Sequence, residues 1–202
     1  MISVNNICKR FGDKVLFEDF SFTAEPKEFV VITGKSGCGK TTLLNILGGL
    51  ESPDSGNVSI GGNDITGRKF RRAFYADVVG FLFQNFALVE NKTVRQNLEM
   101  VMKKHRSGVS AEEALKMVGI EDKINSKVFT LSGGEQQRVA LARLIFKRCD
   151  LILADEPTGS LDSENEDEVL RILHSFCDLG KTVITVTHSE KIIGTEKRVI
   201  RL

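Results

Sequence analysis

The sequence contains no tryptophan, one tyrosine and three prolines, and only four of its 202 residues are cysteines. The cysteines are far apart, and no two of them form a Cys-x-x-Cys pair. This spacing excludes a disulfide framework and gives no zinc-ligand pattern, so we expect reduced thiols. Cys38 differs from Cys8, Cys149 and Cys177 because it lies within a glycine-rich loop, and whether it can be oxidised there depends on the pKa of its thiol.

An excess of one charge and a long hydrophobic run are also missing. The 28 lysines and arginines are balanced by 27 aspartates and glutamates, which leaves a formal net charge of +1. A nucleic-acid-binding protein normally carries a large basic excess, so no nucleic-acid partner is expected. No apolar run approaches the roughly 20 residues that span a bilayer. The first 14 residues also lack the apolar stretch of a secretory signal, so we expect the chain to fold in the cytosol.

Apolar segments of strand and helix type alternate along the chain. The composition, with 41% hydrophobic and 27% charged residues, is that of a globular protein. Strands alternating with helices predict an α/β fold with a mostly parallel sheet. A polar, mainly helical stretch at about 87–130 predicts a helical subdomain inserted into a single domain whose core is 1–86 and 131–202. The expected strands are 2–7, 20–25, 29–33, 57–60, 78–83, 151–154, 182–186 and 197–202, and the main helices 41–50, 94–104, 111–118, 135–147 and 162–179.

The most specific local motif is a glycine-rich loop that follows the apolar strand 29–33. Its sequence, GKSGCGKT, fits the phosphate-binding loop pattern at every fixed position. Its glycines let successive N–H groups point at one anion, and the next helix adds its positive N-terminus. Lys40 should reach the β- and γ-phosphates, and the Thr41 hydroxyl should coordinate Mg²⁺. Thr42 is equally well explained as an α-phosphate contact or an ordinary helix-start residue. The candidate nucleotide-binding residues are Gly34, Lys35, Ser36, Gly37, Cys38, Gly39, Lys40, Thr41 and Thr42.

Two adjacent carboxylates follow the apolar strand 151–154. Asp155, at the strand end, would lie beside the phosphate loop and support Mg²⁺ directly or through water. The two-residue period of a strand would turn Glu156 the other way, where it could polarise an attacking water. GTPases, kinases and ATPases share a phosphate loop, so these residues alone leave the type of enzyme open.

The stretch LSGGEQQR at 131–138 separates these classes. Ser132 is a good helix N-cap, and Gly133 and Gly134 expose backbone N–H groups at the start of a long helix. The sequence therefore predicts a second anion-binding surface, which a single nucleotide needs only if two chains share it. An ordinary capped helix would explain Ser132 but not the two glycines or the polar run after them.

With this stretch the chain resembles the ATPase subunit of ABC transporters over essentially its whole length. The resemblance implies a P-loop NTPase fold, with a RecA-like parallel sheet, an N-terminal antiparallel β subdomain and an inserted helical subdomain. It also implies ATP and Mg²⁺ as ligands and ATP hydrolysis coupled to transport. The matching motifs, in family order, are the phosphate loop, Gln84, LSGGEQQR, Asp155-Glu156, Ser160-Leu161-Asp162 and His188.

The resemblance further implies that two subunits pair head to tail. ATP would lie between the phosphate loop of one copy and residues Ser132, Gly133, Gly134 and Glu135 of the other. Gln84 would act as a catalytic residue and offer its amide oxygen to Mg²⁺ or water, and His188 would contact the γ-phosphate. Phe11 would stack on adenine, or serve simply as a packed aromatic. Ser160, Leu161 and Asp162 would lie on the dimer seam, where Asp162 is also a candidate N-cap.

Ordinary residues around these motifs resemble one branch of the family. That branch contains lipoprotein-releasing, macrolide-exporting and antimicrobial-peptide or bacteriocin-export ATPases. Such subunits dock on a separate membrane permease, here at Phe86–Met100, with Phe86, Leu88 and Val89 as apolar contacts. Packing within the helical lobe is an equally good reading of these three residues. Docking would place the subunit peripherally on the inner face of the cell membrane.

Two other functions are compatible with parts of the sequence. A soluble ABC ATPase of iron–sulfur assembly fits the size of the chain. A phosphoryl-transfer kinase would explain the phosphate loop but would leave the helix at LSGGEQQR without a purpose.

Overall fold

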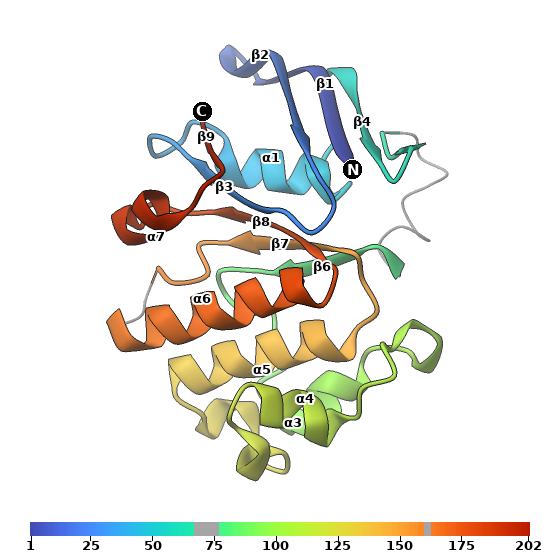
Figure 1. Cartoon of the computed structure of the whole chain (residues 1–202), viewed down its shortest axis with the longest axis vertical. Helices are drawn as coiled ribbons and strands as arrows, with labels where there is room; N and C mark the ends of the chain where they lie inside the picture. The colour runs from blue at the N-terminus through green and yellow to red at the C-terminus, as the bar shows by residue number, and fades with distance from the viewer. Residues whose placement is uncertain (67–76, 160–162) are drawn as a thin grey trace.

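The structure, a computed structural model, describes residues 1–66, 77–159 and 163–202. An antiparallel sheet, a parallel sheet and a group of helices are stacked in layers (Figure 1). The predicted segment Ser160-Leu161-Asp162 lies outside the described residues. Among the described helices, none has both the length and the apolarity needed to cross a bilayer.

Four strands from the N-terminal third of the chain form an antiparallel sheet with the order β2-β1-β4-β5. Strands β1 and β2 form a hairpin, which is longer than predicted because pairing continues through polar residues to Phe11 and Lys14. The observed strands are β1 (Ile2–Phe11), β2 (Lys14–Ala24), β4 (Ser55–Ile60) and β5 (Asn63–Asp64).

The second sheet is parallel throughout, with the order β6-β7-β8-β3-β9. All five residues of β3 and of β8 are buried, which explains their nearly uninterrupted apolar sequences. The predicted α/β class is therefore confirmed. The strands are β3 (Phe29–Thr33), β6 (Val79–Leu82), β7 (Leu151–Asp155), β8 (Thr182–Val186) and β9 (Val199–Arg201).

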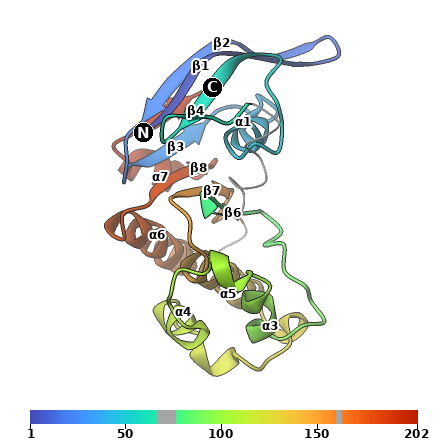
Figure 2. The ribbon, with the colours of Figure 1, turned by 90° about the vertical axis from the view of Figure 1, so that its right-hand side faces the viewer.

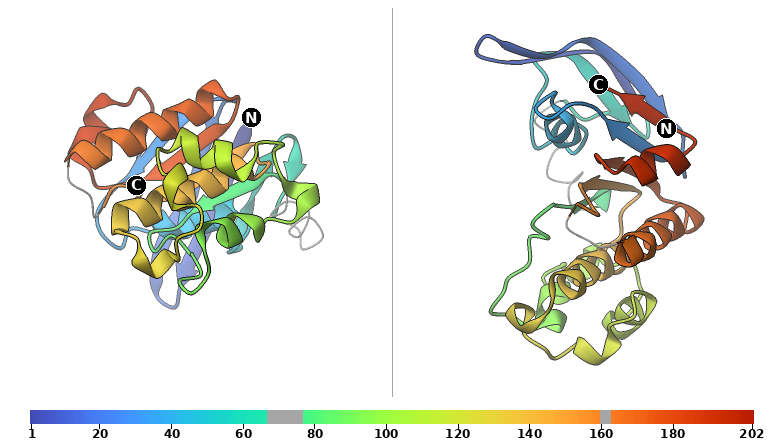
Figure 3. Two further views of the ribbon diagram at one scale, coloured as in Figure 1. Left: turned by 90° about the horizontal axis from the view of Figure 1, so that it is seen from below. Right: turned by 90° about the vertical axis from the view of Figure 1, so that its left-hand side faces the viewer.

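The helices divide between the two faces of the parallel sheet. Helix α1 packs with both sheets in one hydrophobic cluster, whereas α3, α4, α5 and α6 join a second cluster on the opposite face (Figures 2 and 3). The predicted helix 94–104 ends early, and α7 was not predicted. The α-helices are α1 (Lys40–Leu47), α3 (Val94–Glu99), α4 (Ala111–Met117), α5 (Gly133–Phe146), α6 (Ser163–Asp178) and α7 (Glu190–Thr195), and the 3₁₀ helices are Lys103–His105, Glu121–Lys123 and Val128–Thr130.

The buried residues of β3 alternate between these clusters. Val30 and Ile32 pack in the cluster of α1, while Phe29 and Val31 pack in the cluster of α5 and α6. In open α/β folds with both faces covered, ligands usually bind at the carboxyl edge of the sheet. The segments that follow β3, β6, β7 and β8 leave the sheet at that edge, and they carry the predicted site residues other than Phe11 and those at the start of α5.

Candidate active site

The phosphate loop connects the end of β3 to the start of α1. The Lys40 ammonium folds back over the loop and donates hydrogen bonds to the carbonyl oxygens of Gly34 (2.9 Å) and Lys35 (3.2 Å). The residue is 7% exposed. Because carbonyl oxygens carry no net charge, this buried cation is prepared to receive an anionic ligand.

Gly39 is required by the packing of the loop itself. Its φ is +105°, and a Cβ at this position would lie 2.9 Å from Phe17 Cζ. A larger residue would therefore suffer both backbone strain and a clash. The glycine ends the loop and lets α1 begin, with the Leu43 N–H bonded to the Gly39 carbonyl at 2.8 Å.

Asp155 lies beside the phosphate loop, as predicted. The Thr41 hydroxyl donates to Asp155 Oδ1 at 3.3 Å, although the two residues are 114 positions apart. Burial raises the pKa of Asp155, and the hydrogen bond from Thr41 works in the opposite direction. The Thr41 hydroxyl and the Asp155 carboxylate both offer oxygen atoms, which are the ligands that Mg²⁺ prefers. A nearby cation would also stabilise the partly desolvated carboxylate, so the two residues fit Mg²⁺.

Glu156 leaves the strand rather than continuing it. Strand β7 ends at Asp155, and Glu156 has a φ of +47°, in the left-handed region. The predicted reason for its orientation, the two-residue period of a strand, is therefore wrong. Its carboxylate instead turns toward His188, whose backbone N–H donates to Glu156 Oε2 at 3.2 Å and whose Nε2 lies 3.6 Å from Oε1. A positive φ in a non-glycine residue costs on the order of 1 kcal/mol and is often found at functional sites.

Two clefts that share three lining residues bring many of the predicted residues together. The first, of about 370 Å³, is lined by Phe11 and by loop and helix residues including Ser36, Gly37, Gly39, Lys40, Thr41 and Thr42. The second, of about 560 Å³, is lined by Gln84 and the polar residues that follow β7 and β8. Ser36, Glu156 and His188 line both clefts, so the hollow runs from the aromatic ring to the glutamine. Gly34 and Lys35 contribute their carbonyls, and Cys38 is half-buried in the loop.

The clefts also contain residues that the sequence analysis missed. Lys14 lines the first cleft, and its ammonium would lie 3.4 Å from a Cβ built on Gly37. In the second cleft the Glu166 carboxylate accepts hydrogen bonds from the hydroxyls of Ser189 (2.5 Å) and Thr158 (3.3 Å). No local motif marks these residues, because only the fold brings them together. The further missed lining residues are Leu16, Gly159 and Thr187.

The start of α5 has a complete capping box. Ser132 Oγ accepts from the Glu135 N–H (3.3 Å), and Glu135 Oε2 accepts from the Ser132 N–H (2.8 Å). The hydrogen bond from the Ser132 N–H is the main reason that the pKa of the Glu135 carboxyl is lowered. The Glu135 carboxylate thus has a structural partner, whereas the first N–H groups of a helix, here those of Gly133 and Gly134, have none within the helix.

The capped helix start and the phosphate loop do not form one pocket within the chain. Among the residues that the structure describes, Ser132, Gly133 and Gly134 line neither of the two clefts. A Cβ added to Gly133 would meet nothing within 4 Å in the described structure, and one on Gly134 only Asn165 Oδ1 at 3.8 Å. Nothing in the packing of a single described copy therefore requires glycine at these two positions.

The segment Phe86–Met100 is partly used for internal packing. Phe86 and Leu88 are half-buried against the helical cluster, and the Arg143 guanidinium donates to the Phe86 carbonyl at 2.8 Å. Val89 and Met100 are exposed, at 37% and 56%. Of the three predicted apolar contacts, Val89 is the one that lies open.

Comparison with known proteins identifies the family. A sequence profile described as "ABC transporter" matches residues 17–159. The chain belongs to the ABC transporter family. A protein named uncharacterized ABC transporter ATP-binding protein MJ1508, from Methanocaldococcus jannaschii, is 37% identical over 213 residues, which cover 100% of this chain and 95% of the relative.

Other relatives and solved structures agree. The macrolide export ATP-binding/permease protein MacB of Campylobacter jejuni is 37% identical over 209 residues, which cover all of this chain but 33% of MacB. The chain thus spans about a third of that relative's length. Two structures of the ABC cassette MJ0796 superpose on it, a dimer and a post-hydrolysis dimer bound to ADP and Pi, with TM-scores of 0.88 and 0.86 and identities of 35% and 33%. Each match covers 100% of this chain and 94% of the other.

These findings decide between the enzyme classes left open by the sequence. The chain is an ATPase domain of the ABC transporter family and has the P-loop NTPase fold. The relatives do not support the iron–sulfur-assembly alternative, and the family is not one of phosphoryl-transfer kinases.

Proposed function

We propose that this cassette works as a homodimer that closes around two ATP molecules and drives transport through a separate membrane permease. The observation that carries the proposal is the contrast between a cleft with its own phosphate loop and the exposed glycines at the start of α5. Those glycines have no role in the described packing of one copy, so a ligand held by a second copy accounts for them. The dimeric state of the solved MJ0796 cassettes supports this arrangement.

Within each site the chain's own residues hold the triphosphate and the attacking water. Lys40 exchanges its two carbonyl partners for β- and γ-phosphate oxygens. Thr41, Asp155 and Gln84 would hold Mg²⁺, which supplies positive charge to the phosphate oxygens. Glu156 orients and polarises the water, and His188, fixed by its hydrogen bond to Glu156, contacts the γ-phosphate. Ser132, Gly133 and Gly134 of the second copy complete the site, and Phe11 stacks on adenine.

The proposal is tested by Glu156→Gln, which removes the negative charge but keeps the size of the side chain. We expect ATP to bind and dimers to accumulate, while turnover falls by about 100-fold or more, the usual contribution of a general base. Phosphate release and size-exclusion chromatography with ATP measure the two effects. Glu18→Gln, on the exposed side of β2, is the control and should behave as the parent. Unimpaired turnover in Glu156→Gln, or a monomer under ATP, would contradict the proposal.

We further propose that the permease docks on the surface near Phe86–Met100. The subunit would then lie on the cytoplasmic face of the membrane and power export or extraction of a peptide, lipid-linked or antimicrobial substrate. The names of the MacB relatives, which join a cassette and a permease, support an exporter.

The docking surface is tested by Val89→Asp, which places a charge on the exposed apolar residue of this segment. We expect the variant to lose co-purification with the permease and stimulation by it, while its affinity for ATP stays unchanged. Lys116→Asp, on the exposed side of α4, changes charge elsewhere on the lobe and serves as the control. Undiminished stimulation in Val89→Asp would place the docking surface elsewhere.

A further inference from the structure

Lys9 is a buried lysine on the strand that ends at Phe11. Its side chain is 8% exposed, and a lysine is rarely so buried unless it is paired. Its ammonium donates to Glu51 Oε1 (2.8 Å), the Ser52 carbonyl (2.9 Å) and Asp54 Oδ1 (3.4 Å). The hydrogen bond with Glu51 is the main reason that the pKa of Lys9 is raised. The three acceptors match the three N–H bonds of the Lys9 ammonium, so this cation has a fixed position.

The same ammonium lies over the ring of Phe11, 4.9 Å from its centroid. Residues two apart on a strand share a face, so β1 brings these two side chains together. Phe11 is 51% exposed and lines the cleft of the phosphate loop. The contact with this cation thus restricts the rotation of the Phe11 ring at the end of β1.

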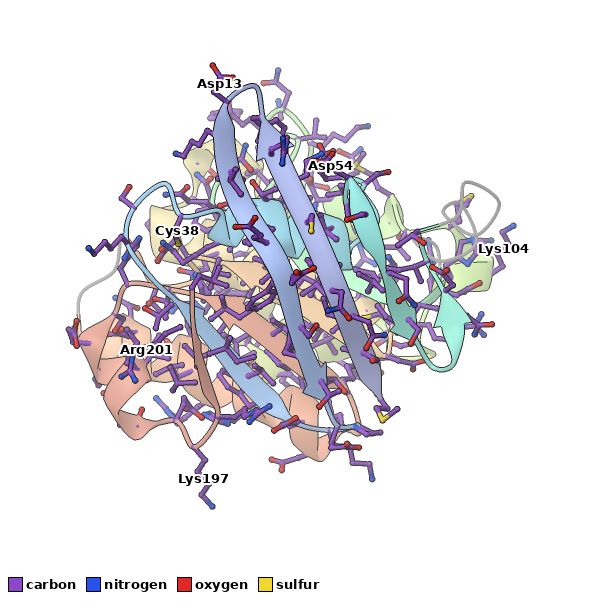
Figure 4. The ribbon with its side chains drawn as sticks, turned by 90° about the horizontal axis from the view of Figure 1, so that it is seen from above. Asp13, Cys38, Asp54, Lys104, Lys197 and Arg201 are labelled. Carbon is purple, nitrogen blue, oxygen red and sulfur yellow. The ribbon has the colours of Figure 1, made fainter. Side chains whose placement is uncertain are left out.

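The acceptors of Lys9 belong to the segment that follows α1. The Glu51 N–H donates to the Asn45 carbonyl within α1 (3.1 Å), and the Asp54 N–H donates to the Cys8 carbonyl on β1 (2.8 Å). Figure 4 shows Asp54 beside β1, at the end of the sheet nearest the hairpin turn at Asp13. Because α1 begins at Lys40, Lys9 connects the aromatic side of the cleft to the helix of the phosphate loop.

We propose that Lys9 is a positioning residue that orients Phe11 for stacking on adenine and fixes its place relative to the phosphate loop. This inference rests on the proposed stacking role of Phe11. A ring that is already ordered loses less side-chain entropy when a base binds. A cation on one face also draws π-electron density away from the other, which favours stacking of an electron-rich purine there.

The test uses the absence of tryptophan from this chain. In a Phe11→Trp parent the indole is the sole tryptophan, and an adenine stacked on it should quench its fluorescence on titration with the non-hydrolysable ATP analogue AMP-PNP. Lys9→Gln keeps a hydrogen-bond donor but removes the charge, and Lys9→Arg keeps the charge. We expect Lys9→Gln to raise the Kd about fivefold, the factor that corresponds to about 1 kcal/mol for ordering one more side chain on binding, and Lys9→Arg to preserve the parent Kd.

Hydrolysis of ATP by the chain with Phe11 in place provides a second readout. Lys9→Gln should raise KM for ATP by a similar factor and leave kcat within about twofold. In a Phe11→Ala background, Lys9→Gln should add no further increase in KM, because the ring through which it acts is gone. Arg10→Gln, the neighbouring exposed cation on the other face of β1, is the matched control and should leave KM unchanged.

The outcomes separate this inference from the proposed function. If the indole does not respond to AMP-PNP, the stacking role of Phe11 is wrong, and the role of Lys9 falls with it. If it responds but Lys9→Gln leaves the Kd and the quenching unchanged, only the role of Lys9 is wrong. Equal increases in KM with and without the Phe11 ring would also overturn it, since Lys9 would then act through the fold. A lower melting temperature with an unchanged Kd leads to the same conclusion.

Discussion

The phosphate loop before α1 (the first loop) and the segment 131–134 at the start of α5 (the second loop) both contain glycines, and they differ in what requires them. At Gly39 the chain's own backbone and the Phe17 ring exclude any larger residue. At Gly133 and Gly134 a side chain would meet almost nothing in the described structure. Glycine near the start of a helix makes the helix less stable than alanine would, by up to about 1 kcal/mol. The comparison indicates that contacts within this chain require the glycine of the first loop. The glycines of the second loop leave room for a molecule that binds from outside the chain.

The two loops also differ in the charged groups that they contain. The phosphate loop holds a buried ammonium that bonds to carbonyl oxygens. At the start of α5 the charged group near the helix end is Glu135, which is occupied by the capping box and also lies 3.7 Å from the Lys123 ammonium. One loop therefore binds an anion with a cation and backbone groups, whereas the other offers backbone N–H groups alone. Changes in the first should affect the monomer, and changes in the second only the assembled site.

The largest effect should come from removing the buried cation of the first loop. Lys40→Ala is expected to weaken ATP binding to the monomer about 100-fold, since charge-assisted hydrogen bonds contribute about 1.5–3 kcal/mol each. Equilibrium binding of a labelled nucleotide to dilute protein measures this effect. Lys116→Ala, on the exposed side of α4, is the control for charge alone. If Lys40→Ala bound ATP normally, the phosphate loop of a single chain would not depend on this lysine to bind the nucleotide.

A charge at the second loop should separate binding from turnover. In Gly134→Asp the side chain has room, and a carboxylate in the first turn of a helix stabilises it by about 0.3–1 kcal/mol. We expect an unchanged or higher melting temperature and normal ATP binding by the monomer, but turnover reduced to about one hundredth because the carboxylate repels the γ-phosphate. Asn165→Ser, which changes the side chain nearest to a Cβ at Gly134 and removes its contact with Arg138, is the control and should keep normal turnover. Full turnover in Gly134→Asp would contradict the conclusion that the start of α5 faces the γ-phosphate in the assembled site.

A smaller effect concerns the junction between the sheet and the lobe. His105 Nδ1 lies 2.8 Å from Asp77 Oδ1, and Arg148 donates to the same oxygen at 2.6 Å. The contact with His105, and next that with Arg148, lowers the pKa of Asp77 below its ordinary 3.8 in the folded state. A carboxyl with a lowered folded-state pKa adds stability that is complete above the unfolded-state pKa and is lost as the pH falls through the folded-state value.

Asp77→Asn should therefore lower the melting temperature at pH 7, and the difference from the parent should narrow as the pH falls below about 4. Thermal melts across this pH range check the prediction. Asp178→Asn, at the exposed end of α6, is the control and should show no such convergence. A constant difference at all pH values would mean that Asp77 acts through its shape rather than its charge.

The elements with strong periodicity were predicted from the sequence, and the weak ones were not. Strand 182–186 was predicted with its observed bounds, and the helix 135–147 lies within two residues of α5. Helix α7 was missed because its six residues are too few to show a helical period. The buried Ile192 and the Ser189 cap hold it in place instead. The polar part of the β1–β2 hairpin was missed because it extends beyond the apolar alternation.

The phosphate loop, the capped start of α5 and the order of the motifs can be read from local sequence, because they depend on backbone geometry within a few neighbouring residues. Which distant side chains meet follows from the packing of the whole fold. It turned Glu156 toward His188 by a positive φ, and it placed Glu166 beside Ser189. It also set Lys9 beneath Phe11 with acceptors more than 40 positions away. Such contacts depend on how sheets and helices pack over long stretches of chain, and no local pattern records that.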